Sequence, residues 1–349
     1  DVLGGRDEPA EQDRVKPVRN QVLNDRHRPL EFGVLRPVEG FGGVFETRDP
    51  NWSTEAGAQA ITELISSENK PDVLIVMAFD LNSYSKLLKK AQAEGIYVIL
   101  IDNPANFKAD AYVGGDWTKL GMLEAEAVIK GCGENSSKKI GLVQGDQVNA
   151  SSLYHYAGIM KIMDKNPDFK IVAKPDSNWD ATTSRNVTTT MLQQNPDICG
   201  IIDFWDGDAT GAAAAIRDAG KQDQVYLVTT GGGEENSTCA NIQSGNFDAV
   251  VSTELYNESE AMVAMVKYLL QSGQPPGTAS PYIYSLMSTV TKENLNPRSC
   301  WSLKALHRLV LNSAAYKQTS TRDAKKYPGI FVTRPTANCC PRPLSSASV

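Results

Sequence analysis

The sequence contains few of the residues that metal centres and nucleic-acid surfaces require. It has only three histidines, and its six cysteines show no CxxC spacing, which argues against a zinc site. The formal net charge is −6, and no cluster of lysine and arginine stands out, although binding to nucleic-acid phosphates requires one. We therefore expect no metal, no other cofactor and no nucleic-acid partner.

Long apolar runs are also missing. No stretch approaches the roughly 20 apolar residues that span a bilayer, so we expect no direct membrane insertion. The first residues, "DVLGGRDEPAEQDR", lack the apolar core of a secretory signal. Export is thus not visible directly, and two readings stay open: the sequence is a mature form, or its true start is missing.

What the sequence does have is a regular alternation of helix and strand patterns. The helical segment "TEAGAQAITELISS" precedes the apolar run "PDVLIVMAFD", and similar pairs recur along the chain up to about residue 290. Parallel strands that alternate with helices form sheets covered on both faces. Because the strands are too many for one comfortable sheet, we predict an α/β fold of two doubly wound parallel-sheet domains.

Candidate ligand-binding residues stand where the predicted strands end, because loops and helix N-termini converge there in an open parallel sheet. Carboxylates and amides bind hydroxyl groups, and aromatic faces cover the apolar C–H face of a sugar ring. We therefore predict a site for a neutral polyhydroxylated ligand. Its candidate residues are Phe79, Asp102, Asn103, Asn149, Trp179, Asp180, Trp205, Asp206 and Thr253.

Catalytic motifs are missing from the same regions. His155 has no serine or cysteine nucleophile in a suitable setting beside it, and at a predicted helix start it can equally donate to a ligand hydroxyl. We add it to the candidates. The stretch "TTGGGEE" has neither of the glycine spacings typical of phosphate-binding loops and predicts a tight turn with positive φ. We expect a protein that is not an enzyme.

Structural roles remain open for several of these residues. Asn149, Asp180 and Asp206 stand where helix N-caps belong, and a capping side chain satisfies backbone N–H groups without touching a ligand. A tryptophan at a strand end is often packed partly into the core. The pairing of the six cysteines is equally open, although an oxidising compartment would allow some of them to form disulfides.

In their order, these motifs resemble the type I periplasmic sugar-binding proteins of ABC transporters, close to the ribose-binding branch. The resemblance covers residues from about 44 to 302. It runs through "DPNWSTEAGAQAITELISSENKPDVLIVMAFD", "GIYVILIDN", "YVGGDWTKLG", "GLVQGDQVNASSLYHYAGIM" and "IQSGNFDAVVSTELYNESEAMVAMVKYLL". It implies a periplasmic protein, a monomer, that binds a monosaccharide or sugar alcohol and delivers it to the ABC transporter permease.

The resemblance also implies which residues contact the ligand. The family's ligand positions fall on Asp102, Asn103, His155, Trp179, Asp180, Asp206 and Thr253. Arginine is usual at the position of His155, and glutamine is common at that of Thr253. The "DG" that follows the next strand in the family appears here as "TTGGG", so that ligand-binding aspartate is missing.

A three-crossing hinge follows from the same resemblance. It implies a first domain of residues 44–116 plus 254–277 and a second domain of residues 117–253 plus 278–303, with the ligand in the cleft between them. Residues 1–43 are interpreted as an atypical leader, and residues 304–349 as an atypical tail.

A lactose-repressor-type regulator is the alternative function, but residues 1–43 show no helix-turn-helix periodicity. A Rossmann-like enzyme would need a nucleotide fingerprint.

Overall fold

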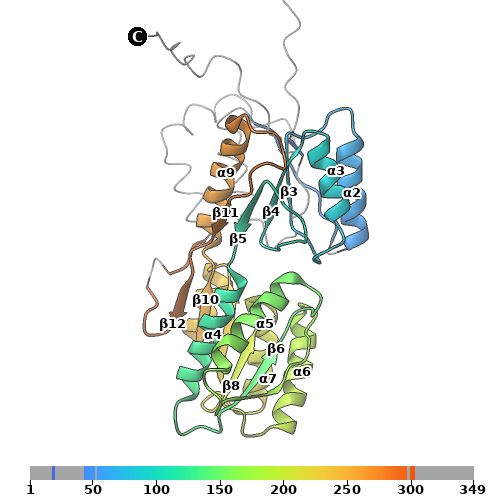
Figure 1. The fold of residues 1–349 in the computed structure, drawn as a ribbon. Helices are drawn as coiled ribbons and strands as arrows, with labels where there is room; N and C mark the ends of the chain where they lie inside the picture. The colour runs from blue at the N-terminus through green and yellow to red at the C-terminus, as the bar shows by residue number, and fades with distance from the viewer. Residues whose placement is uncertain (1–17, 20–42, 52, 297–298, 303–349) are drawn as a thin grey trace, which may run out of the picture.

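The structure is a computed structural model that describes residues 18–19, 43–51, 53–296 and 299–302. Two lobes lie one above the other, each built on its own β-sheet (Figure 1). Helices alternate with strands along the chain, and nearly all strand pairs are parallel. The predicted fold class, two doubly wound α/β sheets, is confirmed.

The first lobe contains a four-stranded sheet in the order β11-β5-β4-β3. Strands β3, β4 and β5 are buried because both faces are covered by apolar side chains, including those of Ile61 on α2, Leu88 on α3 and Met262 on α9, whereas β11 at the edge is largely exposed. Such double coverage explains why the strands read as continuous apolar runs. The elements are α2 (Thr54–Ser66), β3 (Val73–Val76), α3 (Ser85–Ala93), β4 (Tyr97–Ile101), β5 (Ala111–Gly114), α9 (Leu255–Ser272) and β11 (Tyr282–Tyr284).

The second lobe contains a six-stranded sheet in the order β12-β10-β9-β8-β6-β7, in which only β12 runs antiparallel to its neighbour. Neighbouring residues of its strands pack into different cores: Ile201 and Leu227 into one, Ile202 and Val228 into the other. This alternation follows from the two-residue period of a strand. The elements are α4 (Trp117–Cys132), β6 (Lys139–Val143), α5 (Ala150–Met163), β7 (Lys170–Ala173), α6 (Ala181–Gln194), β8 (Gly200–Asp203), α7 (Asp206–Asp218), β9 (Tyr226–Gly231), α8 (Ala240–Ser244), β10 (Ala249–Ser252) and β12 (Ser288–Thr291).

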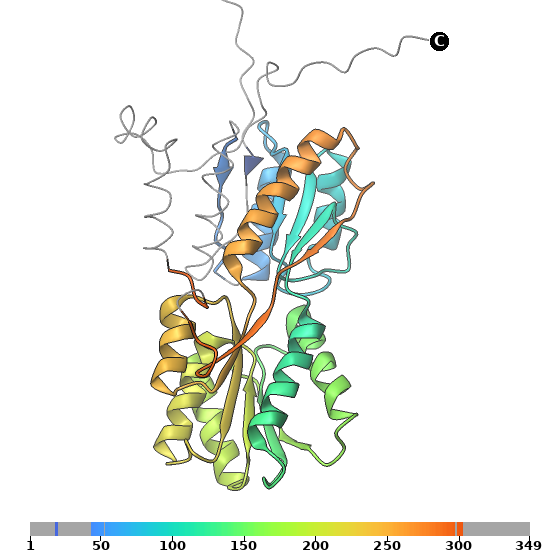
Figure 2. The ribbon, with the colours of Figure 1, turned by 90° about the vertical axis from the view of Figure 1, so that its left-hand side faces the viewer.

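The chain passes between the two sheets at three places: from β5 to α4, from β10 to α9, and from β11 to β12. Figure 2 shows the last of these segments running from one lobe to the other. One predicted boundary needs correction. Residues 278–303 were assigned to the second domain, whereas β11 pairs with β5 in the first sheet. The third crossing therefore begins only after Tyr284.

The predicted leader and tail lie mostly outside the described residues. Two residues of the leader, Val18 and Arg19, form β1 and pair in parallel with β2 (Phe45–Glu46). The predicted tail of residues 304–349 lies wholly outside the described part. Among the described residues, no helix combines the length and the apolar character that crossing a membrane would require.

Two disulfides, whose pairing the sequence left open, lie in the second lobe. Cys132 at the end of α4 pairs with Cys199, 67 residues later and directly before β8. Cys239 pairs with Cys300, 61 residues later. Disulfides persist in oxidising compartments, so this pairing agrees with an exported protein. Cys339 and Cys340 lie outside the described residues.

Candidate functional site

A pocket of about 140 Å³ lies between the lobes, at the carboxyl ends of the strands. The first lobe contributes Met77, Asp102, Asn103 and Leu255, and the second contributes Asn149, Trp179, Phe204, Trp205 and Thr230, among others. A larger hollow of about 550 Å³ lies along α5 and β7 at the outer edge of the second lobe. It contains none of the predicted site residues and belongs to one lobe only, so we place the candidate site between the lobes.

Most of the predicted site residues meet in this pocket. They follow five different strands, namely β4, β6, β7, β8 and β10, as expected if the carboxyl ends of parallel strands converge. The predicted residues that line the pocket are Asp102, Asn103, Asn149, Trp179, Trp205 and Thr253. The lining also includes residues that were not among the candidates, namely Met77, Trp117, Ser151, Phe204, Thr230, Gly231, Gly232 and Leu255.

Asn149 connects the two lobes directly. Its Oδ1 accepts a hydrogen bond from the backbone N–H of Ser151 at 2.9 Å, which makes it the N-cap of α5. Its Nδ2 donates to the carbonyl oxygen of Phe79 in the first lobe at 3.1 Å. Phe79 thus takes part through its backbone, while its buried ring packs against Tyr84 and is not part of the pocket lining.

Asp180 is an N-cap in the structure. The side chain is exposed, and its Oδ1 accepts a hydrogen bond from the backbone N–H of Thr183 at 2.8 Å. This contact stabilises the start of α6. Helix capping was the role that the sequence left open for Asp180 as an alternative to ligand binding. Asp180 does not line the pocket.

His155 does not line the pocket, which corrects the expectation that it belongs to the site. Its side chain is 1% exposed, its ring stacks on Phe204 with the centroids 3.9 Å apart, and its Nε2 pairs with Glu124 of α4. Helix α5 approaches α4 closely because Gly121 and Gly158 lack side chains. Burial raises the pKa of Glu124, and the adjacent histidine counteracts this. His155 therefore supports Phe204, which lines the pocket.

Two of the three tryptophans that line the pocket, Trp179 and Trp205, are fixed by close backbone contacts. The Trp179 backbone has φ 60°, a left-handed conformation that is unfavourable for a bulky residue and typical of functional sites. Its ring covers Gly145, where a Cβ atom would come within 2.1 Å of the indole. The ring of Trp205 covers Gly207 in the same way, at 1.7 Å. Both rings are thus held flat against the backbone.

The buried acids Asp203 and Asp208 form a hydrogen-bond network that holds the backbone of both tryptophans. No sequence motif predicted this network. Asp203 Oδ1 accepts from the Trp205 N–H at 3.4 Å, and the Ser177 hydroxyl accepts from the Trp179 N–H at 3.2 Å while bonding to Asp208. Ser184 donates to Asp203 at 2.9 Å. Burial and the neighbouring Asp208 raise the pKa of Asp203 well above its usual value. A proton shared by the two acids therefore stabilises the network.

Asp206 lies behind the pocket lining. Its side chain is buried against Gly231 and accepts a hydrogen bond from the Thr238 hydroxyl at 3.3 Å. Burial raises the pKa of Asp206 to about 6, although hydrogen bonds from Ser237 and Thr238 counteract this. It does not line the pocket itself, but it supports Gly231, which does.

We expect the variant Asp206→Asn to remove a pH dependence of stability. A carboxyl group whose pKa rises from 3.8 to about 6 on folding binds more protons in the folded state, so wild-type stability falls as the pH rises through this window. The variant should gain about 3 kcal/mol relative to wild type between about pH 4 and 7. Denaturant unfolding at several pH values measures this difference. A difference that stays constant with pH contradicts the expectation.

The loop after β9 carries the predicted glycine turn. Only Gly233 of the three glycines has a positive φ in the left-handed region, 75°, so the predicted turn is confirmed at that residue. A short π-helix (Glu235–Cys239) follows. Glu234 caps it by accepting hydrogen bonds from the backbone N–H groups of Asn236 at 2.7 Å and Ser237 at 2.9 Å.

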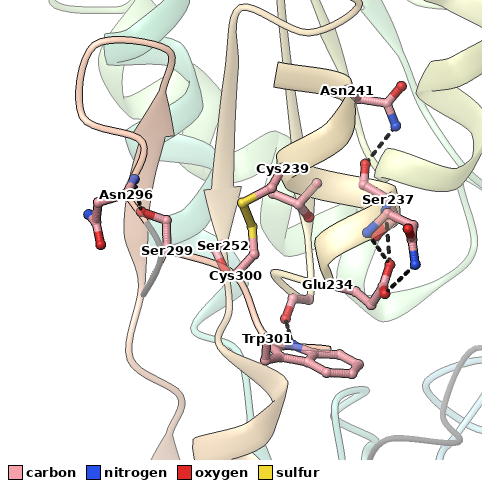
Figure 3. The surroundings of a disulfide bond; sticks show 12 residues. Glu234, Ser237, Cys239, Asn241, Ser252, Asn296, Ser299, Cys300 and Trp301 are labelled. Atoms are coloured by element: carbon pink, nitrogen blue, oxygen red, sulfur yellow. Dashed lines mark hydrogen bonds between the residues drawn. A yellow bond between two sulfur atoms is a disulfide. The ribbon is translucent and has the colours of Figure 1, made fainter. Parts of the chain in front are cut away.

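The second disulfide fixes this loop to a distant segment. Cys300 bonds to Cys239, and the neighbouring Trp301 lies along the loop (Figure 3). The Trp301 indole donates to the Gly232 carbonyl at 2.7 Å, and its backbone N–H donates to the Gly233 carbonyl at 3.0 Å. Because Gly232 lines the pocket, residues 300–301 stabilise one wall of the site.

Known proteins share both the sequence pattern and the fold. A periplasmic binding protein domain matches residues 38–275. The D-ribose/D-allose-binding protein of Pseudomonas aeruginosa is 25% identical over 230 residues, which cover 63% of this chain and 71% of that protein. The D-allose-binding periplasmic protein of Escherichia coli is 28% identical over 171 residues, covering 47% of this chain and 54% of that protein. The chain thus spans little more than half the length of this second relative.

A solved structure extends the comparison of the fold. The periplasmic solute-binding protein of an ABC transporter from Actinobacillus succinogenes, with bound D-allose, superposes with a TM-score of 0.68 at 23% identity. The match covers 80% of this chain and 98% of that one. At this identity the likeness shows the fold alone. The domain match over most of the chain establishes that the chain belongs to the periplasmic binding protein family.

Proposed function

We propose that this protein is the solute-binding component of an ABC importer and captures a monosaccharide or sugar alcohol between its lobes. The observation that supports this most directly is the composition of the pocket. Asp102 and Asn103 of the first lobe and Asn149 of the second surround the same space as Trp179 and Trp205. Hydroxyl groups need fixed donors and acceptors, and a sugar ring also offers an apolar face that an aromatic ring covers.

The function proposed is binding without chemical transformation. The relatives named above are binding proteins, and His155 is engaged with Glu124 and Phe204 in the interior of the second lobe. The described residues hold no cluster of three or more histidine, cysteine or acidic side chains suited to a metal ion. The relatives favour the importer over the repressor alternative, because they are named as sugar-binding or import proteins.

The delivery step follows from the two-lobe architecture. A ligand that contacts both lobes stabilises the closed state, because only that state offers both sets of contacts. We propose that the closed, sugar-loaded monomer acts in the periplasm and docks on the membrane permease. The names of the relatives, which include a periplasmic protein and an import binding protein, support this location and partner.

A thermal-shift screen followed by calorimetric titration tests the proposed ligand class. D-Ribose, D-allose, D-xylose and xylitol serve as probes, and L-arginine is the control solute. A ligand present at 100 times its Kd adds about 2.7 kcal/mol to stability, so the melting temperature should rise by about 5 °C for a true ligand. If none of a wider set of pentoses, hexoses and polyols raises it, the sugar-binding function is wrong.

A further inference from the structure

A buried carboxyl group lies on the segment where the chain crosses between the lobes for the second time. Glu258 lies in the first turn of α9 and is 1% exposed. Its Oε2 accepts a hydrogen bond from the Ser285 hydroxyl at 2.6 Å. Ser285 directly follows β11 and so begins the third crossing. Glu258 thus joins two of the three segments that connect the lobes.

Asp102, which lines the pocket, provides the link to the remaining crossing. Its carbonyl oxygen accepts hydrogen bonds from the Tyr112 hydroxyl at 2.7 Å and from the Trp117 indole at 2.5 Å. Trp117 is the first residue of α4, directly after the first crossing. The backbone of Asp102 has φ 57°, a conformation that these contacts hold in place and that is typical of functional sites.

The side chains of Glu258 and Asp102 are hydrogen-bonded to each other. Two carboxyl groups can bond in this way only if one of them carries a proton, because two carboxylates are both acceptors. The other oxygen of Glu258, Oε1, has no N–H or O–H donor among the described residues. A proton on Glu258 therefore satisfies a buried oxygen and supplies the hydrogen bond to Asp102.

The groups around Glu258 favour this protonated form. Asp102 faces it from the segment after β4, the Tyr112 hydroxyl from β5 and the Ser285 hydroxyl from the segment after β11. Tyr284 on β11 also belongs to this cluster. No lysine, arginine or histidine of the described residues contributes to the pKa of Glu258, and burial followed by the charge of Asp102 raises it well above its usual value.

We propose that Glu258 is a positioning residue for sugar binding: its proton holds the Asp102 carboxylate toward the pocket and connects it, through Ser285, to the segments on which the lobes pivot. This inference rests on the proposed function. Loss of the proton places two negative charges against each other and releases Asp102 from its bound orientation. Sugar affinity then falls as the pH rises, because the wild-type protein binds its ligand most tightly while Glu258 is protonated.

The test compares Glu258→Gln with Glu258→Ala. Glutamine keeps an N–H donor toward Asp102 without a titratable proton, whereas alanine removes the contact. Calorimetric titrations with D-allose and with D-ribose are run between about pH 5 and 9. Wild type should bind about tenfold more weakly at the upper end, Glu258→Gln should show a flat profile, and Glu258→Ala should bind about 10- to 100-fold more weakly throughout. The exposed Glu260 on the same helix gives the control Glu260→Gln, which should keep the wild-type profile.

A second measurement needs no ligand. Denaturant unfolding of the sugar-free proteins should show wild-type stability falling relative to Glu258→Gln as the pH rises above about 4.3, the usual pKa of glutamate, because the folded state holds the extra proton. If Glu258→Gln keeps the wild-type pH slope in unfolding or in binding, the proposal is overturned. If no sugar binds wild type at any pH, the proposed function fails instead, and the unfolding profiles alone decide whether Glu258 holds the proton.

Discussion

Replacing Cys132 and Cys199 together by alanine is expected to lower the free energy of unfolding by about 4 kcal/mol. The bond closes a loop between residues 67 positions apart, and the unfolded chain gains the entropy of that loop when the bond is removed. The bond also lies inside the second lobe, where Cys199 is 4% exposed and Gly200 packs against the Cys132 sulfur. Denaturant unfolding of both proteins measures the loss.

Reduction provides the control for this variant. In the double variant, a reducing agent acts only on the Cys239–Cys300 bond among the disulfides of the described residues. The further loss on reduction therefore reports that bond alone. A double variant within about 1 kcal/mol of wild type would show that the loop-closure account does not hold for this lobe.

Replacing Trp205 by alanine is expected to weaken sugar binding by about 30-fold. The ring lines the pocket, and covering the apolar face of a sugar is worth about 2 kcal/mol at ~25 cal/mol per Å² of buried surface. The fold should tolerate the change, because Trp205 precedes α7 without a side-chain capping hydrogen bond. Calorimetric titration with the sugar found in the screen measures the affinity, and circular dichroism checks the fold.

Two matched variants separate the ring from its orientation. Trp205→Phe keeps an aromatic face and should lose less than tenfold in affinity. Gly207→Ala keeps the indole but places a Cβ atom within 1.7 Å of its present position, so the ring must move and binding should weaken. If Trp205→Ala binds as tightly as wild type, the indole is not a contact surface for the ligand.

The alternation of helices and strands was readable from the sequence because burial on both faces makes each parallel strand a continuous apolar run. The segment "CGIIDFWD" illustrates this: its buried residues Gly200–Asp203 form β8, and Trp205 follows the strand and lines the pocket. Some predictions needed only the position of a residue at a strand end. Asn103 and Thr253 are examples, and both line the pocket.

Predictions that needed the direction of a side chain required tertiary structure. His155 and Asp206 stand near helix starts in the sequence, yet both turn into the second lobe because glycines on the neighbouring elements, Gly121 and Gly231, leave room for them. Glu258 appears in the sequence as one acid of an amphipathic helix. Its contact with Asp102 joins residues far apart in the chain, and no periodicity encodes such a pairing.

Hydrophobic patterns along the chain were enough to predict two sheets of mainly parallel strands and the positions of the strand ends, and the residue types at those ends predicted a ligand class. The patterns did not show which of these side chains share a pocket, which cysteines pair and which acids meet. The physical reason is that hydrophobic periodicity reports burial within each element, whereas a binding site depends on contacts between elements that the chain brings together only when it folds.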